Sequence, residues 1–176
     1  GSRILGAEAL MRVQNDDGAL GAPNEYLAML VETGKLGDAT LGFLSAVLTD
    51  IQTWQQSGPC GPVSVNVPAP LLEADGYMRD FAQIVRERGI LPSAITVEVT
   101  ESAMPSDLAS FVEIATRLRM AGFGLSLDDY GTGMSNYDVL RLCPFTELKI
   151  DRSVVQAATH HALACGFIGN CVAIGR

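Results

Sequence analysis

The sequence contains few of the residues that build zinc sites, disulfide frameworks and membrane spans. Only four of its 176 residues are cysteines, none in a CxxC pair, and only two are histidines. This scarcity argues against a zinc site and against stabilising disulfides, and it favours idle thiols in the reducing cytoplasm. No apolar run reaches about 18 residues and no signal peptide opens the chain, so we expect a soluble segment without membrane contact.

Basic residues are also scarce, with 12 Lys and Arg against 20 Asp and Glu and a net charge of −8. An acidic chain does not attract phosphate polymers, so we expect no DNA or RNA partner. A small anionic substrate stays compatible if metal ions or a local basic side chain offset the repulsion. Apolar residues are abundant at 48%, which predicts one folded domain over residues 3–176, after a tag scar at Gly1–Ser2.

The apolar periodicity switches repeatedly between that of strands and that of helices. Strands are expected over residues 7–13, 63–67, 95–100, 123–127 and 147–150, and helices over 24–33, 38–57, 77–88, 106–121 (capped by Ser106), 134–142 and 157–174. This alternation predicts an α/β fold with parallel strands and helical crossovers. A complete (β/α)8 barrel needs roughly 200 residues, so the chain is too short to close one in the usual way.

Polar side chains recur at the carboxyl ends of these expected strands, where parallel α/β proteins place their sites. They are Glu8, Asn66, Glu98, Glu101, Asp128, Asp129, Lys149 and Asp151. Several strands that each deliver an oxygen to one rim provide what a hard divalent cation needs. Carboxylates and an amide oxygen, without Cys or His, favour Mg²⁺ or Mn²⁺ over zinc.

Each of these residues also has a structural interpretation. Glu8 could be exposed or paired with an arginine, Asn66 could face solvent on an edge strand, and Lys149 could lie on the wet face of its strand. Asp128 and Asp129, before a Gly-Thr-Gly segment, could belong to a turn. The repetition on five strands favours a site, because each polar interruption of a buried parallel sheet needs a partner.

Six ordered motifs between about residues 4 and 155 carry a resemblance to a known family. They are Glu8-Ala9-Leu10 with Arg12, Pro23–Tyr26 with Glu32–Gly34, Val63–Asn66, Val97–Glu101, Asp128–Gly133 and Leu148–Ser153. With these motifs the chain resembles the EAL domain, a bacterial phosphodiesterase that opens cyclic di-GMP to linear pGpG. The resemblance implies a TIM-barrel-like (β/α)8-type fold, here an incomplete barrel that lacks the last strands.

The resemblance implies a two-ion site for Mg²⁺ or Mn²⁺. Glu8, Asn66, Glu98 and Asp128 would bind the first ion, and Asp128 would bridge to a second ion that Asp129 also holds. A pair of such ions about 3.5–4 Å apart neutralises a phosphodiester and supplies a nucleophilic water near neutral pH.

The remaining site residues receive roles by the same resemblance. Lys149 would orient the attacking water, Arg12 would contact a substrate phosphate, and Leu10 of the signature tripeptide would lie on the substrate side. Glu101 would steady the loop after Asp129, which runs to about Ser135, and Asp151 would lie beside the metal site.

Two later motifs of the family, an A-E-G-V-E strand and a Q-G pattern, are absent from this sequence. The Glu of the first is a ligand of the second ion, so we expect weak or no turnover from the 176 residues alone. Either the last strands are missing from this record of the domain, or another chain supplies them by swapping. Val13 and Tyr130 replace the usual Trp and Phe without removing a ligand.

The resemblance also implies a setting. EAL domains usually follow sensory or GGDEF domains in longer proteins, so we expect a cytoplasmic domain, alone or as the cytoplasmic part of a membrane-attached protein. Homodimerisation through the helices of the barrel is common in the family and stays open here.

Two other functions remain as hypotheses. A degenerate EAL receptor would bind cyclic di-GMP without cleaving it, although such members usually lose metal-binding acids that are present here. An enolase-like lyase would use the carboxylates, Mg²⁺ and Lys149 as a base. It would show no affinity for a dinucleotide.

Overall fold

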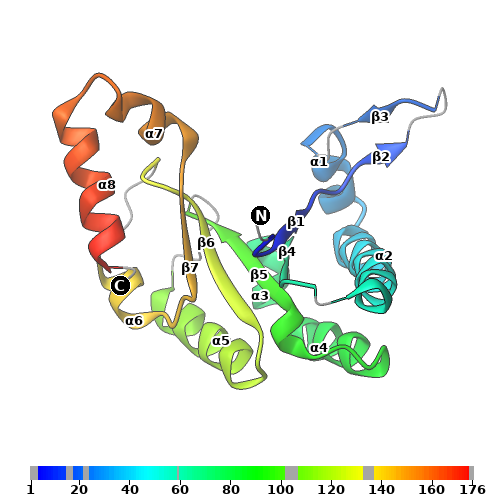
Figure 1. Cartoon of the computed structure of the whole chain (residues 1–176). Coiled ribbons are helices and arrows are strands. Elements are labelled where there is room, and N and C mark those ends of the chain that lie inside the picture. Colours follow the sequence, from blue (N-terminus) through cyan, green and yellow to red (C-terminus); the bar gives the residue numbers. More distant parts are fainter. Residues whose placement is uncertain are drawn as a thin grey trace.

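A curved parallel sheet of five strands forms the centre of the computed structural model, which describes residues 4–14, 18–21, 24–58, 60–101, 107–132 and 137–174. The strands are β1 Ala7–Ala9, β4 Val63–Asn66, β5 Ile95–Thr100, β6 Gly124–Tyr130 and β7 Glu147–Ile150, in this order across the sheet. Within the described residues, β1 and β7 are edges that do not meet, so the sheet is a half-barrel (Figure 1). The predicted α/β fold and the incomplete barrel are confirmed.

Helices follow the strands and lie outside the sheet, with α1 and α2 on one side and α5 to α8 on the other (Figure 1). They are α1 Asn24–Glu32, α2 Leu36–Ser57, α3 Ala69–Glu73, α4 Tyr77–Glu87, α5 Leu108–Met120, α6 Tyr137–Leu142, α7 Arg152–Ala158 and α8 Ala162–Ile174, with a 3₁₀ turn η1 at Pro92–Ala94. An antiparallel ribbon, β2 Val13–Gln14 with β3 Leu20–Gly21, precedes α1. In the described parts of the chain, no helix combines the length and apolarity that crossing a bilayer requires.

The sheet has an apolar face under the helices and a polar face on the inside of the half-barrel. Val97, Val99, Leu125 and Leu127 are fully buried and belong to the core with Phe81 of α4. Side chains alternate along each strand, and partners on neighbouring parallel strands share a face. Two such registers, Asn66 with Glu98 and Thr100 with Asp128, therefore bring polar groups of β4, β5 and β6 together inside the half-barrel.

A bulge interrupts the pairing of β6 with β7. Leu127 pairs with Leu148 and Tyr130 with Ile150, so an advance of 130 − 127 = 3 residues on β6 faces 150 − 148 = 2 on β7. The extra residue lies at Asp128–Asp129, and Asp129 has a positive φ of 55°. A bulge re-aims the side chains around it, which here are two acids next to β7.

Most predicted elements are present, with shifted ends. The strand expected over 7–13 is divided into β1 and the start of the ribbon, and the strand expected over 123–127 continues to Tyr130. The range 157–174, expected as one helix, contains the end of α7 and, after a break, the whole of α8. The predicted cap Ser106 is wrong, because the side chain of Asp107 accepts the hydrogen bond from the N–H of Ala109. The tag scar, Ser106, Ser135 and the expected helix start at Met134 lie outside the described residues.

A tight approach of two strands predicts the cost of a single methyl group. A Cβ at Gly124 would lie 2.5 Å from Thr96 Oγ1 and 3.2 Å from Thr96 Cα, so we expect Gly124→Ala to lower the free energy of unfolding by about 2 kcal/mol. At Gly42, within α2, a Cβ would meet nothing within 4 Å, and we expect Gly42→Ala to stabilise by about 0.5–1 kcal/mol. Urea unfolding of the two variants should therefore give shifts of opposite sign.

Candidate metal and substrate site

Three carboxylates from three strands meet on the inner face of the half-barrel. One oxygen each of Glu8, Glu98 and Asp128 lies within 4.8 Å of the others. Lys149 of β7 enters this group, with Nζ 3.1 Å from Glu8 Oε2, 2.9 Å from Glu98 Oε1 and 3.2 Å from Asp128 Oδ2. The acids at positions 8, 98 and 128 and the lysine at position 149 are therefore brought together from β1, β5, β6 and β7.

Asn66 completes the arrangement from β4. Its Nδ2 donates at 3.4 Å to both Glu8 Oε1 and Glu98 Oε2. Because a terminal amide carries an acceptor and a donor on opposite arms, a rotation of the group presents Oδ1 to the same point. Five consecutive strands of the sheet thus each contribute one polar group to one place.

Burial and charge oppose each other in this cluster. Burial raises the pKa of Glu98, and the negative charge of Glu8 raises it further against the opposing effect of Lys149. Burial alone would lower the pKa of Lys149, but its bonds to Glu98 and Glu8 and the charge of Asp128 outweigh that effect and raise it. The ammonium therefore stays charged and balances part of the acids.

The donor set fits a hard divalent cation. With all three acids ionised, the cluster carries −3 from the carboxylates and +1 from Lys149, a remainder of −2. Glu98 Oε1 is buried, and Lys149 Nζ lies 2.9 Å from it. Oxygen ligands with a net charge of −2 and no sulfur or imidazole match Mg²⁺ or Mn²⁺.

Asp129 lies beside the three acids but outside their 4.8 Å group. Partial burial raises the pKa of its carboxyl, and the charges of Asp128 and Asp151 add to the rise. Its backbone turns at φ 55° into a segment held by Glu101, whose Oε2 accepts the N–H groups of Gly131 at 2.7 Å and Thr132 at 3.2 Å. Thr132 Oγ1 donates to the Asp129 carbonyl at 2.9 Å. We call residues 129–132 the acid turn.

The left-handed backbone at Asp129 predicts a trade between stability and metal binding. Glycine relieves about 1–2 kcal/mol of strain at such a position and costs somewhat less in chain entropy. We therefore expect Asp129→Gly to raise the free energy of unfolding by about 0.5–1 kcal/mol and to weaken Mn²⁺ binding. Asp129→Asn, which tolerates the same backbone, separates the loss of charge from the relief of strain. A destabilised Asp129→Gly variant in urea unfolding would contradict this account.

Sequence comparison matches the whole chain, residues 1–176, to the EAL domain family. The chain belongs to the EAL domain family. It is 31% identical over 155 residues to PdeB of Escherichia coli, which is named a probable cyclic di-GMP phosphodiesterase. This match covers 88% of this chain and 30% of that protein. It is 30% identical over 177 residues to RocR of Pseudomonas aeruginosa, a cyclic di-GMP phosphodiesterase, covering 100% of this chain and 45% of RocR. The chain spans less than half the length of these curated relatives.

Solved structures agree with this EAL assignment. The MucR phosphodiesterase in complex with cyclic di-GMP superposes with a TM-score of 0.89 at 28% identity, over 99% of this chain and 71% of that chain. The FimX EAL domain of Pseudomonas aeruginosa, bound to cyclic di-GMP, superposes with a TM-score of 0.80 over 94% of this chain and 66% of its own. At 17% identity, this second likeness supports the fold alone.

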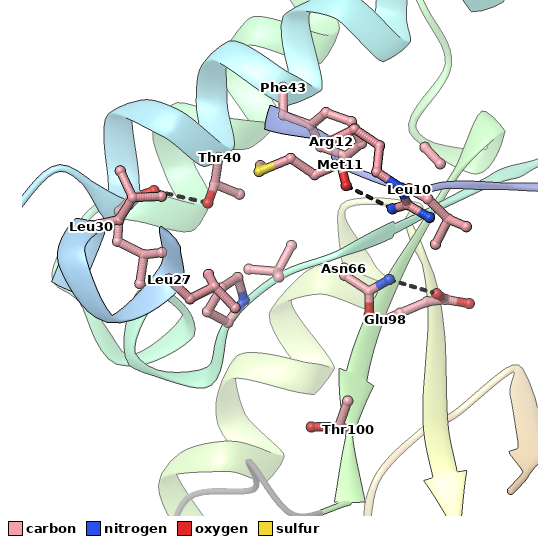
Figure 2. A pocket seen from close by; sticks show the side chains of 14 residues that line it. Leu10, Met11, Arg12, Leu27, Leu30, Thr40, Phe43, Asn66, Glu98 and Thr100 are labelled. Carbon is pink, nitrogen blue, oxygen red and sulfur yellow. Dashed lines mark hydrogen bonds between the residues drawn. The ribbon is translucent and has the colours of Figure 1, made fainter. Parts of the chain in front are cut away.

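An apolar pocket of about 390 Å³ opens beside the acids of this EAL chain. Figure 2 shows Leu27 and Leu30 of α1 and Phe43 of α2 along one side, and Asn66 and Glu98 on the other. The sequence analysis did not select the helical residues of this pocket, because an apolar stripe on a helix predicts core packing equally well. The pocket joins an apolar surface to the oxygen cluster.

The remaining predicted site residues of the EAL chain surround the cluster. Leu10 and Arg12 follow β1, are exposed and line the pocket, with Arg12 Nη1 donating to the Met11 carbonyl at 2.8 Å (Figure 2). Asp151 caps α7, since its Oδ1 accepts hydrogen bonds from the hydroxyl of Ser153 and from the N–H of Ser153, the latter at 2.8 Å, and these bonds lower the pKa of Asp151. None of these three side chains belongs to the group of acids that lie within 4.8 Å of each other among the described residues.

Proposed function

We propose that this EAL chain is the catalytic part of a phosphodiesterase that hydrolyses cyclic di-GMP to linear pGpG with Mg²⁺ or Mn²⁺. The observation that carries the proposal is the convergence of Glu8, Glu98 and Asp128 with Lys149 on one face of the half-barrel. The names of its relatives PdeB and RocR give the substrate class. We further propose that residues 3–176 form one domain of a longer cytoplasmic protein.

The residues that would hold the first ion are Glu8, Asn66, Glu98 and Asp128, and Asp129 would join Asp128 at a second. Bound divalent ions neutralise a phosphodiester and lower the pKa of a water. The sheet contributes fixed positions, since each ligand comes from a strand whose neighbour supplies the next one.

The side chains around the acids would bind and orient the substrate. Lys149 carries three donors and no acceptor, so it orients a water or a phosphoryl oxygen by donating to it. Arg12 lies at the pocket, where its guanidinium suits a phosphate. The apolar wall with Leu27 and Phe43 suits the flat face of a base, while Glu101 steadies the acid turn.

The direct test is the formation of pGpG from cyclic di-GMP with Mg²⁺ or Mn²⁺, for the 176 residues and for a form extended at its C-terminus. We expect turnover in the extended form, and weak or no turnover in the shorter one. Glu8→Ala should abolish turnover, and Glu113→Ala, at an exposed position of α5, should not. An extended form that binds the dinucleotide with unchanged affinity after Glu8→Ala, and never cleaves it, would instead be a receptor.

A further inference from the structure

We infer that Phe167 of α8 is a positioning residue for Asp129: its ring packs against the backbone of the acid turn, whose N–H groups Glu101 accepts. The inference rests on the proposed function only in that Asp129 serves the metal site. Its structural part is the hold of Phe167 and Glu101 on the acid turn, which we call the clamp. The clamp does not depend on any reaction.

The outer side of the acid turn is packed by an aromatic stack. The rings of Tyr130 and Phe167 lie 5.5 Å apart between centroids with an interplanar angle of 22°. A Cβ at Gly131 would lie 3.1 Å from Phe167 Cε1 and 3.0 Å from Val154 Cγ2. The backbone at Gly131, with φ 101°, therefore runs directly against α7 and α8, and only glycine fits there.

Hydrogen bonds also hold the backbone of the same turn. Glu101 Oε2, at the end of β5, accepts the N–H groups of Gly131 and Thr132, and the side chain of Glu101 is 7% exposed. The Tyr130 carbonyl accepts the N–H of Asp151 at 3.1 Å. The turn is thus held by a buried carboxylate and packed against an aromatic ring, with Asp129 at its start.

Phe167 and Cys171 are the side chains of α8 that belong to the core cluster or pack against it. Within α8 only Cys171 is fully buried, while Leu163 is 91% exposed and Val172 and Ile174 are about half exposed. Phe167 is half-buried and packs against the core cluster. Removing its ring leaves a void next to Gly131 and leaves the hydrogen bonds to hold the turn, so we expect the Asp129 carboxylate to lose its fixed direction.

The test compares Phe167→Ala with two control variants of α8. Leu163→Ala removes an exposed apolar side chain of α8, and Phe167→Tyr keeps the stacking ring. We expect Phe167→Ala to speed amide hydrogen exchange of Gly131 and Thr132 about tenfold or more, and to weaken Mn²⁺ binding about tenfold, as loss of a group supporting a metal ligand does. In both control variants, the exchange rates of these amides and the affinity for Mn²⁺ should stay within about twofold of the values for the parent chain.

Exchange of the β5 amides and far-UV circular dichroism report whether Phe167→Ala is folded, and Phe167→Leu replaces it if it is not. Unchanged exchange at Gly131 and Thr132 in a folded Phe167→Ala or Phe167→Leu variant would overturn the clamp. Faster exchange with unchanged Mn²⁺ affinity would overturn the positioning of Asp129. A parent chain that binds no Mn²⁺ while the clamp is intact would instead count against the proposed function.

Discussion

Replacing Lys149 by glutamine is expected to lower the free energy of unfolding by about 3 kcal/mol when no divalent cation is present. The ammonium lies within 3.2 Å of Glu8, Glu98 and Asp128, and Glu98 is only 1% exposed. Without the ammonium, three acids on one inner face repel each other with no balancing charge. The loss of one partner from such a buried group costs about 3–5 kcal/mol, and the partial exposure of Glu8 places the expected value at the lower end.

Mg²⁺ should restore the stability of Lys149→Gln, because the cation and the ammonium balance the same negative charge. Urea unfolding with EDTA and with saturating Mg²⁺ measures both effects. Mg²⁺ should raise the free energy of unfolding more in Lys149→Gln than in the parent chain. Lys35, the other lysine of the sequence, is exposed before α2, so Lys35→Gln is the matched control. Equal effects of the two substitutions would contradict the charge-balance account.

Replacing Glu98 by glutamine is expected to weaken Mn²⁺ binding by more than about 100-fold. Glu98 is the most buried of the three acids, and its Oε1 lies 2.9 Å from Lys149 Nζ. A glutamine of the same size offers one neutral oxygen and a donor amide, and removes one of the three charges that favour the cation. Groups that only support a ligand already contribute about 10–100-fold, so a central ligand should contribute more.

Calorimetric titration with Mn²⁺ measures this loss, and thermal unfolding with and without Mg²⁺ checks it independently. We expect the stabilisation by Mg²⁺ to disappear in Glu98→Gln. Glu113→Gln, which breaks an exposed ion pair with Arg117 on α5, should leave Mn²⁺ binding unchanged. Retention of near-parent affinity in Glu98→Gln would show that the ion binds elsewhere.

Much of the fold follows from the sequence because apolar periodicity depends on local geometry. The strands at Val63–Asn66 and Ile95–Thr100 and the helix α2 have the predicted type and nearly the predicted ends. The end of β6 could not be predicted, since Asp128 and Asp129 look like a turn until the pairing with β7 is known. The division of residues 157–174 is likewise hidden, because α8 is apolar on all sides and has no periodic polar face.

The sequence predicts which residues of the candidate site come together better than it predicts their contacts. Parallel strands bring their carboxyl ends together, so a polar group on each of five strands predicts one cluster, and the structure places Glu8, Glu98, Asp128 and Lys149 close to one another. The sequence could not show that Lys149 forms ion pairs with all three acids. The packing of Phe167 on Tyr130 was equally hidden, because it joins residues 37 positions apart whose contact depends on how α8 folds back.

The most direct test of the central claim is the anomalous scattering of Mn²⁺ in crystals of the chain soaked with that ion. The account predicts an anomalous peak between the side chains of Glu8, Asn66, Glu98 and Asp128, at about 2.0–2.3 Å from their oxygens, with the Lys149 ammonium displaced from the position between the acids. The absence of a peak there at saturating Mn²⁺, with the three ion pairs of Lys149 intact, would contradict the account.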